Sequence, residues 1–195
     1  MDATTAVLTG LGLATAAGLN AYVPLLVVGL LGRIGFLDLT APYDSLSSTP
    51  ALIALGILLA VEVLADKVAG VDSVNDVIQT AVRPAAGAVL FAGSIGLLTD
   101  LPPWVGVVAG LLPAGGVHAT KAVVRPAVTV STAGVGNPLV SAVEDVFSLV
   151  VSVLAILAPV LMALLLLVAG GVLWRWWRRR RPPREGSAVP AAEGS

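Results

Sequence analysis

The chain has 195 residues, of which 57% are hydrophobic and 12% charged, and its formal net charge is −1. Its mean hydropathy is +0.96, and a domain folded in water could not bury so much apolar surface at this length. With no cysteine in the chain, disulfides, thiolate metal sites and thiol redox chemistry are excluded as well.

The apolar runs predict an all-α fold, a polytopic transmembrane helix bundle. In lipid every backbone N–H and C=O must find its partner within the segment, and strand-like alternation of polar and apolar residues is absent. The first run, from Ala6 to Gly32, carries no charge and is long enough to cross a hydrocarbon core of roughly 30 Å. No Lys or Arg precedes it, so we expect a retained span and not a cleaved leader.

The helical hydrogen bonding of this first span is expected to be interrupted near Pro24. Pro24 cannot donate a hydrogen bond to the carbonyl four residues earlier, which belongs to Asn20. A free carbonyl and a side-chain amide therefore coincide. The pattern indicates either a ligand-binding point or a helix-packing point.

The next two helices carry the charges in the middle of the chain. Thr49 as cap and Pro50 as first residue predict a second helix, which runs to about residue 68 and has Glu62 and Asp66 one turn apart near its end. A third helix is expected to begin at residue 72 or 73 and to continue past Arg83 toward residue 98.

A fourth helix is predicted from about Pro103 to Arg125, followed by a connector of small residues and a cap at Asn137. The remaining segment, Pro138 to Trp177, would make a helix of about 60 Å, roughly twice what the hydrocarbon needs. One tall helix kinked at Pro159 is favoured, which makes five spans with an outside N-terminus. A hairpin at this proline, which makes six spans, stays open.

The sequence "LWRWWRRRRPPR" directly follows the last apolar segment. Tryptophans followed by a basic cluster are typical of a helix end at the cytoplasmic face. We therefore predict a transmembrane domain at 1–177, a basic and then disordered cytoplasmic tail at 178–195, and a multi-pass location in the cell (inner) membrane. A nucleic-acid site is the weaker interpretation of the arginines, because their position suits a topology anchor with affinity for anionic lipid.

Polar side chains at helical spacing form three stripes, and a charge facing lipid costs about 2.5–3.5 kcal/mol. We expect the stripes to turn toward the bundle interior, where they would form ion pairs or line a path for a solute or a proton. The stripes comprise Asp72, Asp76, Gln79 and Arg83, then His118, Lys121 and Arg125, then Asn137, Ser141, Glu144, Ser148 and Ser152.

Two features qualify this expectation. Glu62, Asp66 and Lys67 lie near a helix end, so an interfacial position is an equal alternative for them. Arg83 and Arg125 each precede a proline, which predicts a broken helix beside protein or water.

The stripes also suggest an internal repeat. The segments 80–96 and 122–136 share Val-Arg-Pro-Ala, and the polar spacing at 76, 79 and 83 recurs at 118, 121 and 125. A duplication, as in many transporters, and a chance match in apolar sequence both stay open. Gly106 and Gly110 form a small-xxx-small pair that favours close helix packing.

Signals of an enzyme are weak. The chain has one histidine, no cysteine, and no spacing typical of a nucleophile with its base. The glycines of "GLGLATAAG" lack the strand that a dinucleotide fold requires. We expect no catalytic residues, no metal and no cofactor.

Four motifs occur in the order "GLNAYVPLLVVGLLGR", "VEVLADKVAGVDSVNDVIQTAVRPAAGA", "GGVHATKAVVRP" and "GNPLVSAVED". In these motifs the chain resembles an uncharacterised family of small bacterial integral membrane proteins, domain of unknown function 4126. The resemblance covers about residues 6 to 165 and leaves the arginine-rich tail outside. It implies a polytopic membrane protein and no established activity, so no residue role is carried over.

We expect a small transporter or channel-like permease; the alternative is a non-transporting scaffold or lipid-interacting membrane protein. Carboxylates would carry protons or cations, and the basic stripe would pair with anionic groups. The expected partners are membrane lipid, a homo-oligomer of this chain and a small polar or ionic solute, with no nucleic acid. The expected polar path comprises Asn20, Glu62, Asp66, Asp72, Asp76, Gln79, Arg83, His118, Lys121, Arg125, Asn137, Glu144 and Asp145.

Overall fold

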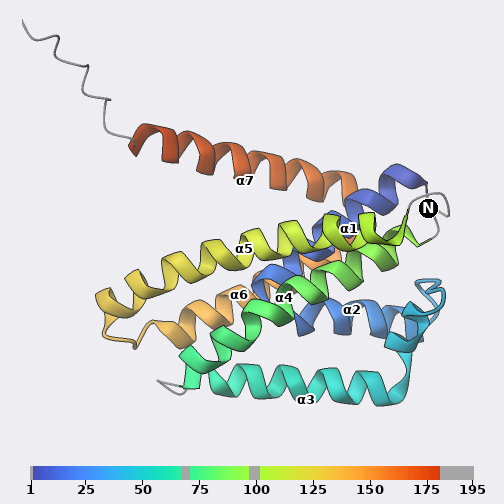
Figure 1. Cartoon of the computed structure of the whole chain (residues 1–195), viewed down its shortest axis with the longest axis horizontal. Helices are drawn as coiled ribbons and strands as arrows, with labels where there is room; N and C mark the ends of the chain where they lie inside the picture. Colours follow the sequence, from blue (N-terminus) through green and yellow to red (C-terminus); the bar gives the residue numbers. More distant parts are fainter. Residues whose placement is uncertain (1, 67–70, 97–101, 181–195) are drawn as a thin grey trace, which may run out of the picture. The chain divides into compact units, whose positions relative to one another are not determined.

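The computed structural model describes residues 2–66, 71–96 and 102–180. This part of the chain contains seven α-helices, one short 3₁₀ helix and no strand (Figure 1), so the predicted all-α class is confirmed for it. The chain divides into two compact units, Met1–Ala163 and Leu164–Ser195. The polar residues that concern function all lie in the first unit.

The first apolar run forms two helices, so the prediction of a single continuous span is wrong. α1 (Ala3–Leu19) and α2 (Tyr22–Arg33) are separated by Asn20, whose backbone is extended at φ −145 and ψ 125. The Asn20 side chain holds this break open, because its Oδ1 accepts hydrogen bonds from the backbone N–H groups of Tyr22 at 2.9 Å and Val23 at 3.1 Å. The interruption inferred from Pro24 is thus a true helix break, since a side-chain amide satisfies the first donors of α2.

The 3₁₀ helix η1 (Tyr43–Ser47) leads into α3 (Thr49–Ala65). The cap of α3 is Ser48 and not Thr49, because Ser48 Oγ accepts the N–H of Ala51 at 3.3 Å. α3 ends at Ala65, before the predicted end near residue 68, and residues 67–70 lie outside the described part.

α4 (Val71–Ile95) and α5 (Pro103–Thr132) both continue through their internal prolines. The predicted continuation of the third helix past Arg83 is thus confirmed, and the breaks suggested by the prolines after Arg83 and Arg125 are wrong. Each proline removes one backbone hydrogen bond, and the rest of the ladder and the packing of the two helices keep the helix intact. α5 also extends into the predicted connector and ends where Ala133 adopts a left-handed φ of 49.

The two helices pack backbone to backbone. A Cβ on Gly110 would overlap the carbonyl oxygen of Gly87, and one on Gly106 would lie 3.1 Å from the Cα of Ala92. The small-xxx-small pair therefore lies at the α4–α5 contact, as the sequence predicts. This close approach brings the polar faces of both helices together.

The last apolar segment forms α6 (Asn137–Leu157) and α7 (Pro159–Arg180), interrupted at Ala158 with φ −142 and ψ 62. A single tall helix kinked at Pro159 is therefore wrong. Gly136, not Asn137, precedes the first turn of α6. α7 includes the first residues of the predicted tail, and residues 181–195 lie outside the described part.

Two helices in the described part are long and apolar enough to cross a membrane by length and composition, Trp104–Thr132 and Asn137–Leu157. The other apolar helices are shorter. The number of five or six spans stays a prediction.

The interior of the first unit holds large polar side chains beside its apolar core. Arg83 and Gln79 are among its largest fully buried side chains, and Leu13, Leu90 and Phe91 are buried as well. Many large apolar side chains are exposed, for example Ile53 at 58%, Val77 at 73% and Leu112 at 65%. Fully buried charged groups together with exposed large apolar side chains are unusual in a protein folded in water.

Candidate functional site

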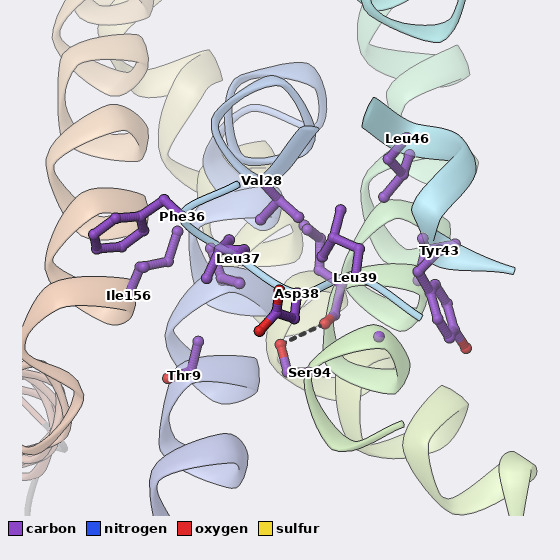
Figure 2. A pocket seen from close by; sticks show the side chains of 14 residues that line it. Thr9, Val28, Phe36, Leu37, Asp38, Leu39, Tyr43, Leu46, Ser94 and Ile156 are labelled. Carbon is purple, nitrogen blue, oxygen red and sulfur yellow. Dashed lines mark hydrogen bonds between the residues drawn. The ribbon is translucent and has the colours of Figure 1, made fainter. Parts of the chain in front are cut away.

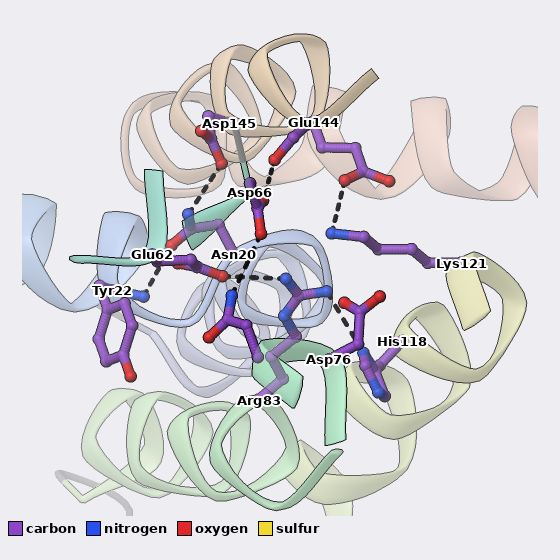
Figure 3. A network of polar contacts seen from close by, with 12 residues as sticks. Asn20, Tyr22, Glu62, Asp66, Asp76, Arg83, His118, Lys121, Glu144 and Asp145 are labelled. Carbon is purple, nitrogen blue, oxygen red and sulfur yellow. Dashed lines mark hydrogen bonds and ion pairs between the residues drawn. The ribbon is translucent and has the colours of Figure 1, made fainter. Parts of the chain in front are cut away.

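Eleven of the predicted path residues lie in the interior of the first unit or at its edge, and we call them the polar network; Figure 3 labels all of them except Gln79 and Arg125. Each member except Gln79 has a hydrogen bond or an ion pair with another member. They come from the α1–α2 break, the end of α3, the first half of α4, the second half of α5 and the start of α6. The members are Asn20, Glu62, Asp66, Asp76, Gln79, Arg83, His118, Lys121, Arg125, Glu144 and Asp145.

The most deeply buried ion pair joins α3 to α4. Arg83 Nη2 donates to Glu62 Oε1 at 2.9 Å, and the two side chains are 1% and 2% exposed. Both charges have lost nearly all their water, so each depends on the other. Removing either partner would leave an uncompensated buried charge.

His118 is held between α4 and α5, and its contacts assign its tautomer. Arg83 Nη1 lies 3.3 Å from Nδ1 and can only donate, so Nδ1 is the acceptor. Thr80 Oγ1 donates its proton to the carbonyl of Asp76 at 2.9 Å, so it accepts from Nε2 at 3.1 Å. The ring therefore carries its proton on Nε2 and is neutral.

Arg125 connects two carboxylates from different helices. Its Nη1 donates to Asp76 Oδ1 at 2.6 Å, and its Nη2 lies 3.7 Å from Asp66 Oδ2. Asp66 also accepts hydrogen bonds from Asn75 Nδ2 at 3.1 Å and from Ser141 Oγ. Asp66 thus ties α3 to α4, α5 and α6.

Two further contacts attach α6 to the network. Lys121 Nζ lies 2.5 Å from Glu144 Oε2. Asn20 Nδ2 donates to Asp145 Oδ1 at 2.8 Å, and Ser148 Oγ donates to the carbonyl of Ala16 at 3.0 Å. The helix break at Asn20 is therefore fixed from both sides by α6.

The polar residues of α4 and α5 pair in reverse order. Asp76, the first of the repeated positions on α4, contacts Arg125, the last of those on α5, and Arg83, the last on α4, contacts His118, the first on α5. The contact pattern is thus unchanged when the two stripes exchange places. Such pairing is compatible with the internal repeat suggested by the sequence, and two antiparallel helices with matching polar spacing produce it as well.

The network carries more negative than positive charge. It has five carboxylates, on Glu62, Asp66, Asp76, Glu144 and Asp145, against the three cations Arg83, Lys121 and Arg125. His118 is neutral in this arrangement, so these eleven described residues carry two negative charges in excess when all five carboxylates are ionised. Within the described part of the chain, Asp145 makes an amide hydrogen bond but no ion pair.

Several buried polar atoms of the network have no hydrogen-bond partner among the described residues. They are Glu62 Oε2, Gln79 Oε1 and Arg83 Nε. Unsatisfied atoms of this kind cost about 1–3 kcal/mol each; the two oxygens could accept hydrogen bonds from a further ligand, and Arg83 Nε could donate one.

Three residues singled out in the sequence are placed outside the network or not described. Asn137 lies at the start of α6 beside the α5–α6 turn, where its Oδ1 accepts from Thr129 Oγ1 at 3.1 Å. The side chain of Asp72, and Lys67 as a whole, lie outside the described part.

Sequence reasoning missed two residues that contact the network, Asn75 and Thr80, and it placed Ser141 in the third stripe without including it in the path. Thr80 lies one turn after Asp76, so helical spacing could have included it. Asn75 contacts Asp66 across two helices, and no local pattern indicates this contact.

Comparison with known proteins gives one match. A family model described as a domain of unknown function (DUF4126) matches residues 7–179. The match thus extends past residue 165 into the arginines that were expected to lie outside it. No curated protein and no solved structure matches the chain.

Proposed function

The chain belongs to the DUF4126 family, a domain of unknown function, and we propose that it is a multi-pass membrane protein that acts as a small proton- or cation-linked permease. The excess of two negative charges in the buried polar network supports this proposal most directly. Isolated buried carboxylates are too costly to remain ionised without a counter-charge. The network therefore holds two protons or small cations, and a site that binds and releases them can couple their movement to a solute.

The membrane location is supported by the outward-facing apolar side chains. Val77 at 73% and Leu112 at 65% exposure sit on the helices whose opposite faces carry the network. In water this surface would promote aggregation, whereas in lipid it is the favourable arrangement. Lipid is therefore the proposed surrounding of the first unit.

The proposed orientation, with a cytoplasmic C-terminus, is supported by the end of α7. Arg175, Arg178 and Arg179 follow its apolar part, and the Arg178 guanidinium lies 5.5 Å from the ring centroid of Trp174. Basic residues beside an interfacial tryptophan favour the cytoplasmic face.

Asp145 is the proposed site of proton or cation exchange. Its carboxylate is half-buried and bonded to an amide, whereas the other four carboxylates of the network each contact a cationic side chain. It also contacts the α1–α2 break, and broken helices in membranes supply ligand sites in many transporters. Exchange at Asp145 would alter the bond that holds Asn20 and hence the junction of α1 and α2.

A second candidate is a non-transporting scaffold, which is favoured by the closed pairing of Glu62 with Arg83. A scaffold would use these pairs only to fix helix packing. The two functions differ in whether the carboxylates exchange protons with water, and a flux measurement separates them.

The test is an ion-flux assay with the purified chain in proteoliposomes that contain a pH-sensitive dye. Under an inward proton gradient, or under a sodium or potassium gradient, we expect flux above that of empty liposomes. We expect Asp145→Asn to lower it at least tenfold. Asp44→Asn is the matched control, because Asp44 is exposed on η1 and far along the chain from the network.

Loss of flux in Asp145→Asn with normal flux in Asp44→Asn would support the permease. Flux equal to that of empty liposomes under every gradient would contradict it and favour the scaffold.

A further inference from the structure

A separate pocket of about 200 Å³ lies within the first unit, away from the polar network (Figure 2). Its walls come from the first half of α1, the second half of α2, the segment 36–39, η1, the second half of α4 and the end of α6. It shares no residue with the polar network, so its role can be tested independently of the proposed function.

The polar atoms of the pocket are mainly acceptors. Asp38 contributes an exposed carboxylate, which accepts hydrogen bonds and cannot donate when ionised. Ser94 Oγ already donates its proton to the carbonyl of Leu90 at 2.8 Å, so only its lone pairs remain for a ligand. No Lys, Arg or His is among the lining residues. The pocket is therefore complementary to a hydrogen-bond donor with positive charge.

Thr9 supplies a second, independent indication of a ligand. Its side chain lines the pocket and is 5% exposed, and its Oγ1 has no hydrogen-bond partner in the described part of the chain. A buried hydroxyl without a partner costs free energy that a bound polar group would recover.

The remaining wall is apolar and includes two aromatic rings. Leu13 and Val28 line the interior, and Phe36 and Tyr43 lie on the segment that closes the pocket. Aromatic faces attract organic cations through the negative face of the ring. A dry apolar cavity of roughly 150 Å³ accommodates benzene, so the volume here suits one ring with a short chain.

We propose that this pocket binds a protonated amine attached to an apolar body of about the size of one aromatic ring. The ammonium group is held by the Asp38 carboxylate and by the hydroxyl oxygens of Thr9 and Ser94. The ring lies among the apolar side chains. Acids of the same shape are disfavoured, because no Lys, Arg or His among the lining residues balances their charge and the Asp38 carboxylate repels them. Neutral molecules of the same shape lose the ion pair with Asp38.

The test measures binding of phenethylammonium to the full-length protein in lipid nanodiscs by isothermal titration calorimetry at neutral pH. We expect saturable binding with one site per chain. Phenylacetate, which has the opposite charge, is expected not to compete. Ethylbenzene, which has the ring but no charge, is expected to bind at least fivefold more weakly.

Three variants assign the binding to this pocket. Asp38→Asn is expected to weaken binding roughly fivefold, the upper range for a solvent-exposed ion pair. Thr9→Val removes the buried hydroxyl without changing the shape and is expected to weaken binding about threefold. Asp44→Asn, which removes an exposed carboxylate outside the pocket, is expected to leave binding unchanged.

Absence of saturable binding would overturn the proposal. Equal affinities of the wild type and Asp38→Asn would also overturn the proposal. If Asp44→Asn weakened binding as much as Asp38→Asn, the effect would be one of general surface charge, and the proposal would again be overturned. None of these results depends on ion flux through the polar network, so failure here and failure of the permease are distinguishable.

Discussion

The pair of Glu62 with Arg83 allows the interior of the protein to be tested by a double-mutant cycle. Arg83→Met leaves the Glu62 carboxylate, which is 2% exposed, without its cation; Glu62→Met leaves the guanidinium, 1% exposed, with His118 as its remaining side-chain partner. Loss of one partner of a buried pair costs about 3–5 kcal/mol. We therefore expect each single variant to lower the free energy of unfolding by about this amount.

The double variant Glu62→Met with Arg83→Met should behave differently. Two methionines of similar length replace both charges, and apolar replacements of buried pairs are often neutral or stabilising. We expect the double variant to lie within about 2 kcal/mol of the wild type, so the two substitutions are far from additive.

The assay is reversible unfolding by a denaturing detergent in mixed micelles, followed by circular dichroism. Arg33→Met is the control, because Arg33 is exposed and donates only to the carbonyl of Ser47 at 3.2 Å, so its loss should cost less than about 0.5 kcal/mol. Single variants that each cost less than about 1 kcal/mol, with a double variant equal to their sum, would refute the buried, coupled pair.

Three further predictions concern the helix contacts and the network. Gly110→Leu should lower the free energy of unfolding by about 1–3 kcal/mol or more, because the new Cβ would overlap the Gly87 carbonyl. Gly116→Ala is the control and should raise the free energy of unfolding by roughly 0.5–1 kcal/mol, because the space around its Cβ is open. The reverse order of the two variants in the same detergent assay would contradict the α4–α5 contact. Asn20→Ala removes the oxygen that accepts the N–H groups of Tyr22 and Val23 at the start of α2, and it should lower the free energy of unfolding by about 1–2 kcal/mol. The expected readout is faster proteolysis at the α1–α2 junction. Unchanged proteolysis would show that this cap is dispensable. In the native chain, which has no thiol, Asp145→Cys should react with a small charged thiol reagent while its exposed apolar neighbour Val146→Cys should not, and protection of both would argue against water access to the network.

Much of the polar network could be predicted from helical spacing. Gln79 and Arg83 lie one turn apart and are both 1% exposed, and His118, Lys121 and Arg125 share the facing side of α5. The cost of placing charges in lipid is a local property of each helix, so the inward-facing side can be predicted without knowing its neighbours. Which carboxylate meets which cation depends on helix register, and spacing alone contains no information about it.

The errors have a common origin in the balance between local and tertiary interactions. Prolines at 84 and 126 favour a break, yet α4 and α5 continue because packing compensates for one lost hydrogen bond in each. At Asn20 the helix does break, because side chains satisfy the backbone groups that the break exposes. The Asn20 side chain accepts the N–H of Tyr22, Ser148 donates to the Asn20 carbonyl, and Asp145 holds the Asn20 amide in place. Proline therefore indicates where a helix can break, and neighbouring groups decide whether it does.

The sequence by itself determined the helical class and the stripes of polar side chains on α4, α5 and α6, because these follow from hydropathy and from the period of a helix. It left open whether Glu62 and Asp66 are buried, and the structure buries both. Only the tertiary structure decided that the first run folds as two helices, that Arg125 joins Asp66 to Asp76 while Asp145 lacks a cation among the described residues, and that Thr9, Asp38 and Ser94 line one pocket. These features join residues far apart in the chain, and their free energies depend on distances and burial that exist only once the helices have packed.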